Sequence, residues 1–348
     1  MEDMPTINVV LGQYSDLFML LSAAVYAVAF IAYAWDLVKS SKLIQAIDSA
    51  ALTAEAKELA LVSAGSADGA GSARGKGDDK INPHVDEKMN YIAQTTNRGA
   101  AKAAVALTWL GVAMHGFAVV SRGIAAGRVP WGNMYEFLST GSFVVAFVFV
   151  IVLLKKDLRF MGTFVIGMVT LMLCGATMGF PTPVAHLVPA LQSPWLIIHV
   201  SIAVLASSLF TLTFAMNVLQ LIQNERQTRI VAGKGDLAPF LRLVPSAAAL
   251  ENFAYRINAV AFVMWTFTLM AGAVWAEAAW GRYWGWDTKE VWTFVIWVVY
   301  AGYLHARATG GWTGARSAWL SIIGYLCVIF NFTVVNLYFN GLHSYAGV

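Results

Sequence analysis

The chain has 348 residues, of which 58% are hydrophobic and 12% charged, and its mean hydropathy is +0.63. A soluble globular domain carries roughly 25% charged residues, so this composition excludes an ordinary soluble domain and predicts a polytopic membrane protein. The net charge is only +3, and the two cysteines, Cys174 and Cys327, lie far apart in apolar segments. The absence of CxxC argues against a zinc or dithiol site, and the absence of CxxCH against a c-type cytochrome.

Eight segments have the roughly 20 mostly apolar residues that a spanning helix needs. In chain order they are 16–38, 102–121, 138–154, 160–180, 194–222, 256–275, 290–308 and 317–337. We therefore expect an all-α polytopic integral membrane protein with about eight transmembrane helices. Three parts follow: 1–38 with the first span, 39–101 as a cytoplasmic insertion, and 102–348 as the main transmembrane domain. The insertion contains AGSADGAGSARGKGDD, a composition typical of a flexible segment.

The distribution of basic residues predicts the orientation, because cytoplasmic segments carry an excess of Lys and Arg. With the N-terminus outside, the four inner segments hold 19 of the 23 Lys and Arg residues, and the outer segments hold four. Both termini and the loop before the seventh span are then expected on the outer face. The Lys and Arg residues of the short loops alone predict the same orientation, so the prediction does not depend on the long insertion.

That outer loop belongs to the most unusual stretch of the chain, Trp275–Trp292, which reads WAEAAWGRYWGWDTKEVW. Five of its 18 residues are tryptophan, although the whole chain has only 13. Tryptophans also gather at membrane interfaces simply as anchors, which is the competing interpretation. Flat apolar faces beside a few charges favour a large planar ligand with a polar edge. The residues expected to contact it are Trp275, Trp280, Arg282, Tyr283, Trp284, Trp286 and Asp287.

Two histidines reach the same face from either side of this loop in the sequence. His199 lies at the outer end of the fifth span, and His343 lies in the outer tail. Heme fits this combination, because it is flat, its iron takes axial imidazoles, and its propionates need polar or cationic partners. The sequence predicts His199 and His343 as axial ligands, with Arg282 as a guess for the propionates.

The other histidines lie elsewhere. His305 is about 22 Å from the outer end of its span, whereas His115 is about 20 Å from the inner end of its own, so the two lie at different depths. His305 is therefore expected either to share a metal with another chain or to hydrogen-bond a neighbouring helix. His115 is expected to be structural, and His186 a surface residue, although a ligand role stays open for both. His84 falls in the insertion and is expected to be solvated.

The loop WGRYWGWDTKEVW resembles the tryptophan-rich "WWD" signature of the heme-handling membrane proteins of cytochrome c biogenesis. The segments PWGNMYEFL, LQSPWLIIHV, WTFVIWVVYAGYLHAR and VNLYFNGLHSYAG resemble the CcsA/ResC branch, called CcsB in some species, of the system II pathway. The resemblance covers about 102–348, which becomes a WWD-type heme-handling domain with its Trp-rich outer loop at 275–289. It implies that His199 and His343 are the external axial ligands and His305 the transmembrane heme ligand.

The family further implies that heme b is carried as a substrate and that a ResB-type membrane subunit supplies the histidine opposite His305. With that partner, heme would be moved outward and positioned for thioether attachment to the CxxCH of apocytochrome c. The chain would then be part of a heme lyase, in the plasma (inner) membrane or in a thylakoid if plastid-encoded. No catalytic acid or base is expected in the chain: Asp287 and Glu290 are assigned structural roles. Nucleic acid is not an expected partner.

Three alternatives stay open. A system I heme-handling protein that loads a heme chaperone shares the Trp-rich loop but differs in its number of spans. A membrane cytochrome b subunit for electron transfer would pair histidines at matched depths within its own helices. A transporter of an unrelated substrate would use the loop only at the interface.

Overall fold

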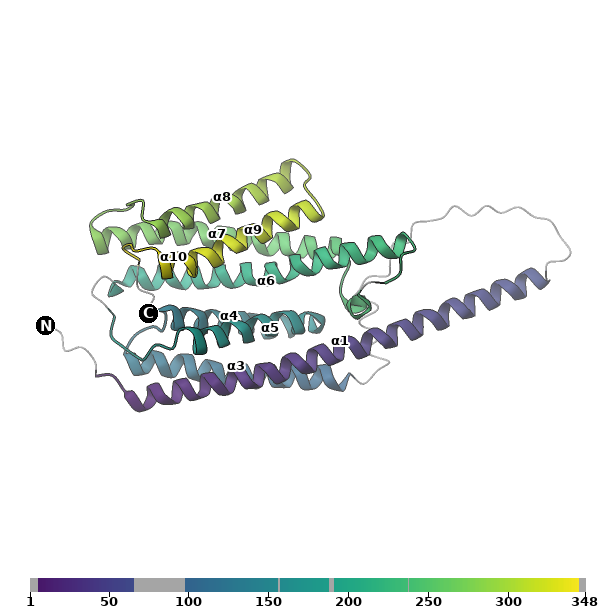
Figure 1. The fold of residues 1–348 in the computed structure, drawn as a ribbon, viewed down its shortest axis with the longest axis horizontal. Helices are drawn as coiled ribbons and strands as arrows, with labels where there is room; N and C mark the ends of the chain where they lie inside the picture. Colours follow the sequence, from purple (N-terminus) through teal and green to yellow (C-terminus); the bar gives the residue numbers. More distant parts are fainter. Residues whose placement is uncertain (1–5, 66–97, 156, 188–190, 237, 344–348) are drawn as a thin grey trace.

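The computed structural model describes residues 6–65, 98–155, 157–187, 191–236 and 238–343. In those ranges it contains helices and connecting loops and no strand, which confirms the all-α expectation. The long helices run side by side along one direction (Figure 1). Their bounds are α1 Val9–Gly65, α3 Gly99–Ala126, α4 Met134–Leu153, α5 Gly162–Cys174, α6 Pro194–Val231, α7 Ala247–Trp280, α8 Thr288–Thr309 and α9 Ala315–Phe332.

Short helices complete these elements. A π-helical turn, η2 (Gly175–Gly179), continues α5, and α10 (Val334–Tyr338) follows α9 after Thr333. The 3-10 turns η1 (Arg159–Met161) and η4 (Pro239–Leu243) precede α5 and α7.

Seven helical segments of the described chain are long and apolar enough to cross a membrane, which supports the expected multi-pass protein. The expected span at 290–308 lies in α8, which is not one of the seven. Its 22 residues reach about 33 Å at 1.5 Å per residue, the length of a bilayer core of ~30 Å. Four aromatic residues with hydrogen-bonding groups and two cations lower its hydropathy. The eighth span, like the orientation, therefore stays a prediction.

Helix α1 is longer than expected, because it continues from the membrane-spanning part to Gly65. The first half of the predicted flexible insertion at 39–101 is thus helical. The physical reason is composition: 39–64 contains no Gly or Pro and is rich in Ala, Leu and Lys, which are strong helix formers. The glycine-rich part from 66 to 97, including His84, lies outside the described residues.

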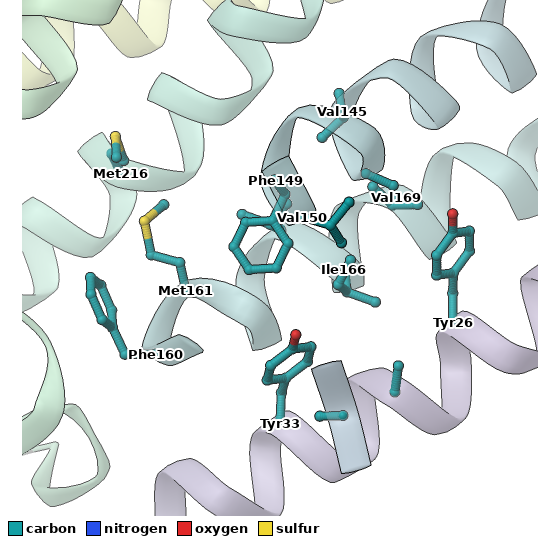
Figure 2. Packing of buried hydrophobic residues seen from close by; sticks show 14 of the residues in the cluster. Tyr26, Tyr33, Val145, Phe149, Val150, Phe160, Met161, Ile166, Val169 and Met216 are labelled. Atoms are coloured by element: carbon teal, nitrogen blue, oxygen red, sulfur yellow. The ribbon is translucent and has the colours of Figure 1, made fainter. Parts of the chain in front are cut away.

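Two large apolar cores hold the helices together, and a smaller third cluster forms around Leu191, Leu196 and Trp275. The larger core fills the space between α1, α3, α4 and α5 and reaches α6; Figure 2 shows Tyr33, Phe149, Ile166 and Met161 converging there. The second core packs α6 against α7, α8 and α9, with Phe210 stacked on Tyr300 at 3.8 Å between ring centroids. Contacts of α4 with α6 join the two groups. The candidate site lies at one end of this junction.

Candidate functional site

The Trp-rich loop is a short, firmly held connection between α7 and α8. Helix α7 ends at Trp280, and Gly281 caps it in the left-handed region at φ 71°. Asp287 begins α8 with a reciprocal capping box, in which Glu290 reaches back to the Asp287 backbone. Glu290 Oε2 also accepts the Gly285 N–H at 2.8 Å. The structural roles expected for these two carboxylates are consistent with these contacts.

The loop contains one strained residue. Trp286 has φ 59°, a left-handed conformation that costs a non-glycine residue roughly 1–2 kcal/mol. Its indole is 76% exposed and meets the Trp284 ring edge-on at 5.8 Å. Strain of this kind persists where surrounding contacts over-determine the backbone, and here the two Glu290 hydrogen bonds on either side of Trp286 do so.

His343 is anchored by Asp287, the N-cap residue of α8. Its Nδ1 lies 2.7 Å from Asp287 Oδ2, and the adjacent Leu342 N–H donates to Asp287 Oδ1 at 3.1 Å. The Asp287 side chain is only 9% exposed. The hydrogen bond from His343 holds the pKa of the Asp287 carboxyl below its usual range, so the acceptor is ionised at neutral pH. One carboxylate therefore folds the C-terminal tail back onto the Trp-rich loop.

His199 is held in a similar way by α7. Its Nδ1 lies 2.9 Å from the backbone oxygen of Thr268. The imidazole is nearly parallel to the Trp275 indole, with 12° between the planes and 5.8 Å between centroids. Gly272 makes this approach possible, because a Cβ there would lie 2.7 Å from the His199 ring.

The hydrogen-bond acceptors select the same tautomer for both imidazoles. A carbonyl or a carboxylate oxygen only accepts, so Nδ1 of each ring must donate, and the lone pair of the neutral ring then lies on Nε2. This arrangement is typical of metal-ligating histidines: one ring nitrogen, here Nδ1, donates to an oxygen, and the other, here Nε2, is free to bind the metal. The His343 ring also meets the Trp275 indole at 5.5 Å, so the two imidazole centroids are at most about 11 Å apart.

The two histidines line one cavity at the end of the bundle. The cavity encloses about 1120 Å³ of empty space, counting the part that opens outward. Its wall is mainly apolar and aromatic, with a few polar groups, and comes from α4, α6, α7, α8, α9, α10 and the loops at this end.

The predicted contact residues divide into two sets. Trp275, Tyr283 and Trp284 line the cavity, and Asp287 acts from behind His343. Trp280 contacts the His343 ring at 4.9 Å without lining the cavity. Two other loop residues, Arg282 and Trp286, are exposed and absent from the lining, and the Arg282 guanidinium donates to the Gly285 backbone oxygen at 3.3 Å.

A second wall comes from the loop before α4 and the first turns of α4, where 131–134 and Phe137 line the cavity. Glu136 fixes it: this fully buried carboxylate pairs with Arg122 at 3.0 Å and Arg128 at 2.7 Å, and accepts the Gly132 N–H at 2.8 Å. The motif PWGNMYEFL was noted in the sequence only as a resemblance. The sequence did not indicate that the Glu of this motif, Glu136, pairs with Arg122 and Arg128.

The remaining histidines lie away from this cavity. His305 is 18 residues along α8 from Asp287, about 27 Å at 1.5 Å per residue, at the other end of the bundle. Its side chain is exposed, and no polar group in the described part of the chain hydrogen-bonds its ring. His115 is fully buried between Tyr26 and Phe143 at 5.8 and 5.5 Å. His186 is exposed in the loop after η2.

Comparisons with known proteins identify the family. Residues 131–343 match the family model described as cytochrome C assembly protein. A cytochrome c biogenesis protein CcsA of Guillardia theta is 34% identical over 238 residues, covering 65% of this chain and 79% of the relative. Its namesake from Porphyra purpurea is 33% identical over 258 residues, covering 65% and 81%.

A third relative gives the same result. The protein named CcsA in Prochlorococcus marinus is 31% identical over 248 residues, covering 65% of this chain and 78% of the relative. The family match includes both cavity histidines and the whole Trp-rich loop. The chain belongs to the cytochrome c assembly protein family and is a CcsA-type cytochrome c biogenesis protein of the membrane.

Proposed function

We propose that this chain binds heme b in the end cavity, as a substrate, and presents it for covalent attachment to apocytochrome c. The observation that supports this most directly is the pair His199 and His343, which line one cavity while each directs Nδ1 to an oxygen acceptor. Two Nε2 lone pairs suit the two axial positions of heme iron. The apolar aromatic wall suits the faces of the macrocycle.

The attachment itself is an addition. Each thiol of CxxCH adds across one heme vinyl group: a carbon–sulfur bond forms, the thiol hydrogen goes to the other vinyl carbon, and no net oxidation occurs. The chain contributes orientation rather than proton transfer, because its two cavity-end carboxylates are engaged with backbone N–H groups and His343. Fixing each vinyl near its thiol lowers the barrier by proximity. In this role the chain is one part of a heme lyase.

The route by which heme reaches the end cavity involves His305 and a second chain. An exposed histidine near the opposite end of α8, unpartnered within the described chain, suits a heme ligand shared with another membrane subunit. We assign that partner to the ResB type of the system II pathway. Heme would pass from this inner site to the end cavity on the outer face of the plasma membrane, or on the lumenal face of a thylakoid if the gene is plastid-encoded.

The test is spectroscopic. The chain purified with its partner should carry heme with a low-spin bis-imidazole spectrum. His199→Gly and His343→Gly should each lose it, regain it on addition of free imidazole, and fail to mature cytochrome c. His186→Gly removes an exposed histidine outside the cavity and should change nothing. Normal cytochrome maturation by both cavity variants would refute the axial assignment.

A further inference from the structure

Lys289 is a cation in the cavity lining that has no part in axial ligation. It lies in the first turn of α8, and its side chain lines the cavity together with His199 and His343. The Nζ atom donates to Asn336 Oδ1 and lies 3.4 Å from the Asn331 backbone oxygen. It also sits 4.7 Å from the centroid of the Phe332 ring.

All of these partners are neutral, and the nearby carboxylates are used elsewhere. Asp287 accepts hydrogen bonds from His343, from the Leu342 N–H and from the Lys289 backbone N–H. Glu290 accepts from the Gly285 and Asp287 N–H groups. Within the described ranges, Lys289 makes no ion pair.

The position of this cation works against the stability of the helix. A positive charge in the first turn opposes the helix dipole, typically by about 0.3–1 kcal/mol, and its side chain is half-buried rather than free in solvent. Placing an ammonium there without a carboxylate is unfavourable unless something else uses it. The same two features, a helix N-terminus and an ammonium, together favour a bound anion.

The cavity as a whole indicates which anion fits. Besides Lys289, its charged or titratable lining residues are the two histidines, Glu290 and Tyr283. Arg282, the cation expected for the heme propionates, is exposed outside the lining. Lys289 is therefore the aliphatic cation that faces the space between the imidazoles and the aromatic wall.

We propose that Lys289 binds a carboxylate of the cavity ligand, namely a propionate of heme b. This rests on the proposed function and deepens it. Two axial bonds alone leave a heme free to rotate about the axis through its iron. A single cation at one side of the cavity removes that freedom, because it selects the propionate edge. The vinyl edge, which lies on the opposite side of the macrocycle, is then turned away from Lys289 in a defined direction.

The experiment compares heme b with its dimethyl ester, in which both propionate charges are removed. Lys289→Met keeps the length of the side chain and deletes the charge, and Lys289→Arg keeps the charge. Arg282→Met is the matched control, since it removes a cation of the same loop that lies outside the cavity lining. The full chain with its membrane partner is titrated with each compound, and the spectrum is recorded.

Lys289→Met should weaken the binding of heme b by about 10- to 150-fold, the range of one charge-assisted hydrogen bond. It should bind the ester as tightly as the parent chain does, with an unchanged bis-imidazole spectrum. Lys289→Arg and Arg282→Met should retain most of the affinity for heme b.

Equal affinity of parent and Lys289→Met for heme b would overturn the proposal. An equal loss for heme b and ester would also overturn it, since it would assign Lys289 to folding of the Asn336 region. Failure of the proposed function is distinct: the parent chain itself would then lack the bis-imidazole spectrum.

Discussion

Replacing Asp287 by Asn tests how the C-terminal histidine is held. The carboxylate accepts three hydrogen bonds, from His343 Nδ1, the Leu342 N–H and the Lys289 N–H. Asn is itself a good N-cap, so α8 should begin at the same residue. Its amide has one acceptor oxygen, however. In the capping position that oxygen takes the place of Oδ2, which faces both the Lys289 N–H and His343 Nδ1, so the NH₂ group would face the Leu342 N–H. The substitution thus separates the tail from the helix start.

The expected magnitude follows from the loss of the hydrogen bond that the Leu342 N–H, next to His343, donates to the carboxylate. A hydrogen bond to a charged group contributes about 1.5–3 kcal/mol. At about 1.4 kcal/mol per factor of ten, His343 should be held about 10- to 150-fold less tightly. Removal of groups that orient metal-ligating histidines typically lowers affinity by 10–100-fold, which is the same range.

The assay is a heme titration of the purified complex, with the fraction of low-spin bis-imidazole heme as the readout. The Asp287→Asn variant should show weaker heme binding and a high-spin component that free imidazole suppresses. Glu277→Gln is the control, because Glu277 is exposed near the same loop and its loss changes the net charge equally. If Asp287→Asn bound heme as the parent chain does, or if the control lost as much affinity, the role of the Asp287 carboxylate in holding the tail would be refuted.

Three further predictions concern other parts of the molecule. Gly272→Ala puts a methyl group 2.7 Å from the His199 ring and should abolish its ligation, leaving five-coordinate heme by absorption spectroscopy, whereas Gly302→Ala meets no atom within 4 Å and should be silent. His305→Gly should lower the heme content of the end cavity in the complex, measured as heme per protein; a normal content would exclude a route through His305. Glu136→Gln leaves the buried Arg122 with the half-exposed Asp16 carboxylate alone and Arg128 with no ion pair in the described ranges, and should destabilise the fold by about 3–5 kcal/mol, measured by unfolding in detergent; an unchanged transition would contradict the role of Glu136 in holding this cluster.

The sequence predicted the elements well because hydropathy is a local property. Runs of about 20 apolar residues have few other stable forms in a bilayer, so each expected span coincides with a helix. The difference lies in α1, which continues to Gly65, because the glycine-rich composition of AGSADGAGSARGKGDD was extended to the whole of 39–101 as a sign of a flexible segment. Helix propensity, not hydropathy, decides structure in that part of the chain.

The candidate ligands were also accessible from the sequence, with limits that have a physical cause. His199 and His343 were expected on one face from the span count, and the structure brings both to one cavity. The expected cation, Arg282, was chosen by its position among the tryptophans. The structure instead directs Lys289 into the cavity, because the first turn of α8 points that side chain toward α9 and α10.

The sequence by itself determined that this chain is a helical membrane protein with a tryptophan-rich loop between two histidines. The tertiary structure decided which nitrogen of each histidine is left free. It did so through the Thr268 carbonyl on a neighbouring helix and the Asp287 carboxylate 56 positions before His343. Contacts of this kind depend on the rotation of packed helices about their axes, which hydropathy does not record. The loop's aromatic residues are local facts, whereas the cavity that they line is built by six converging helices and the loops beside them.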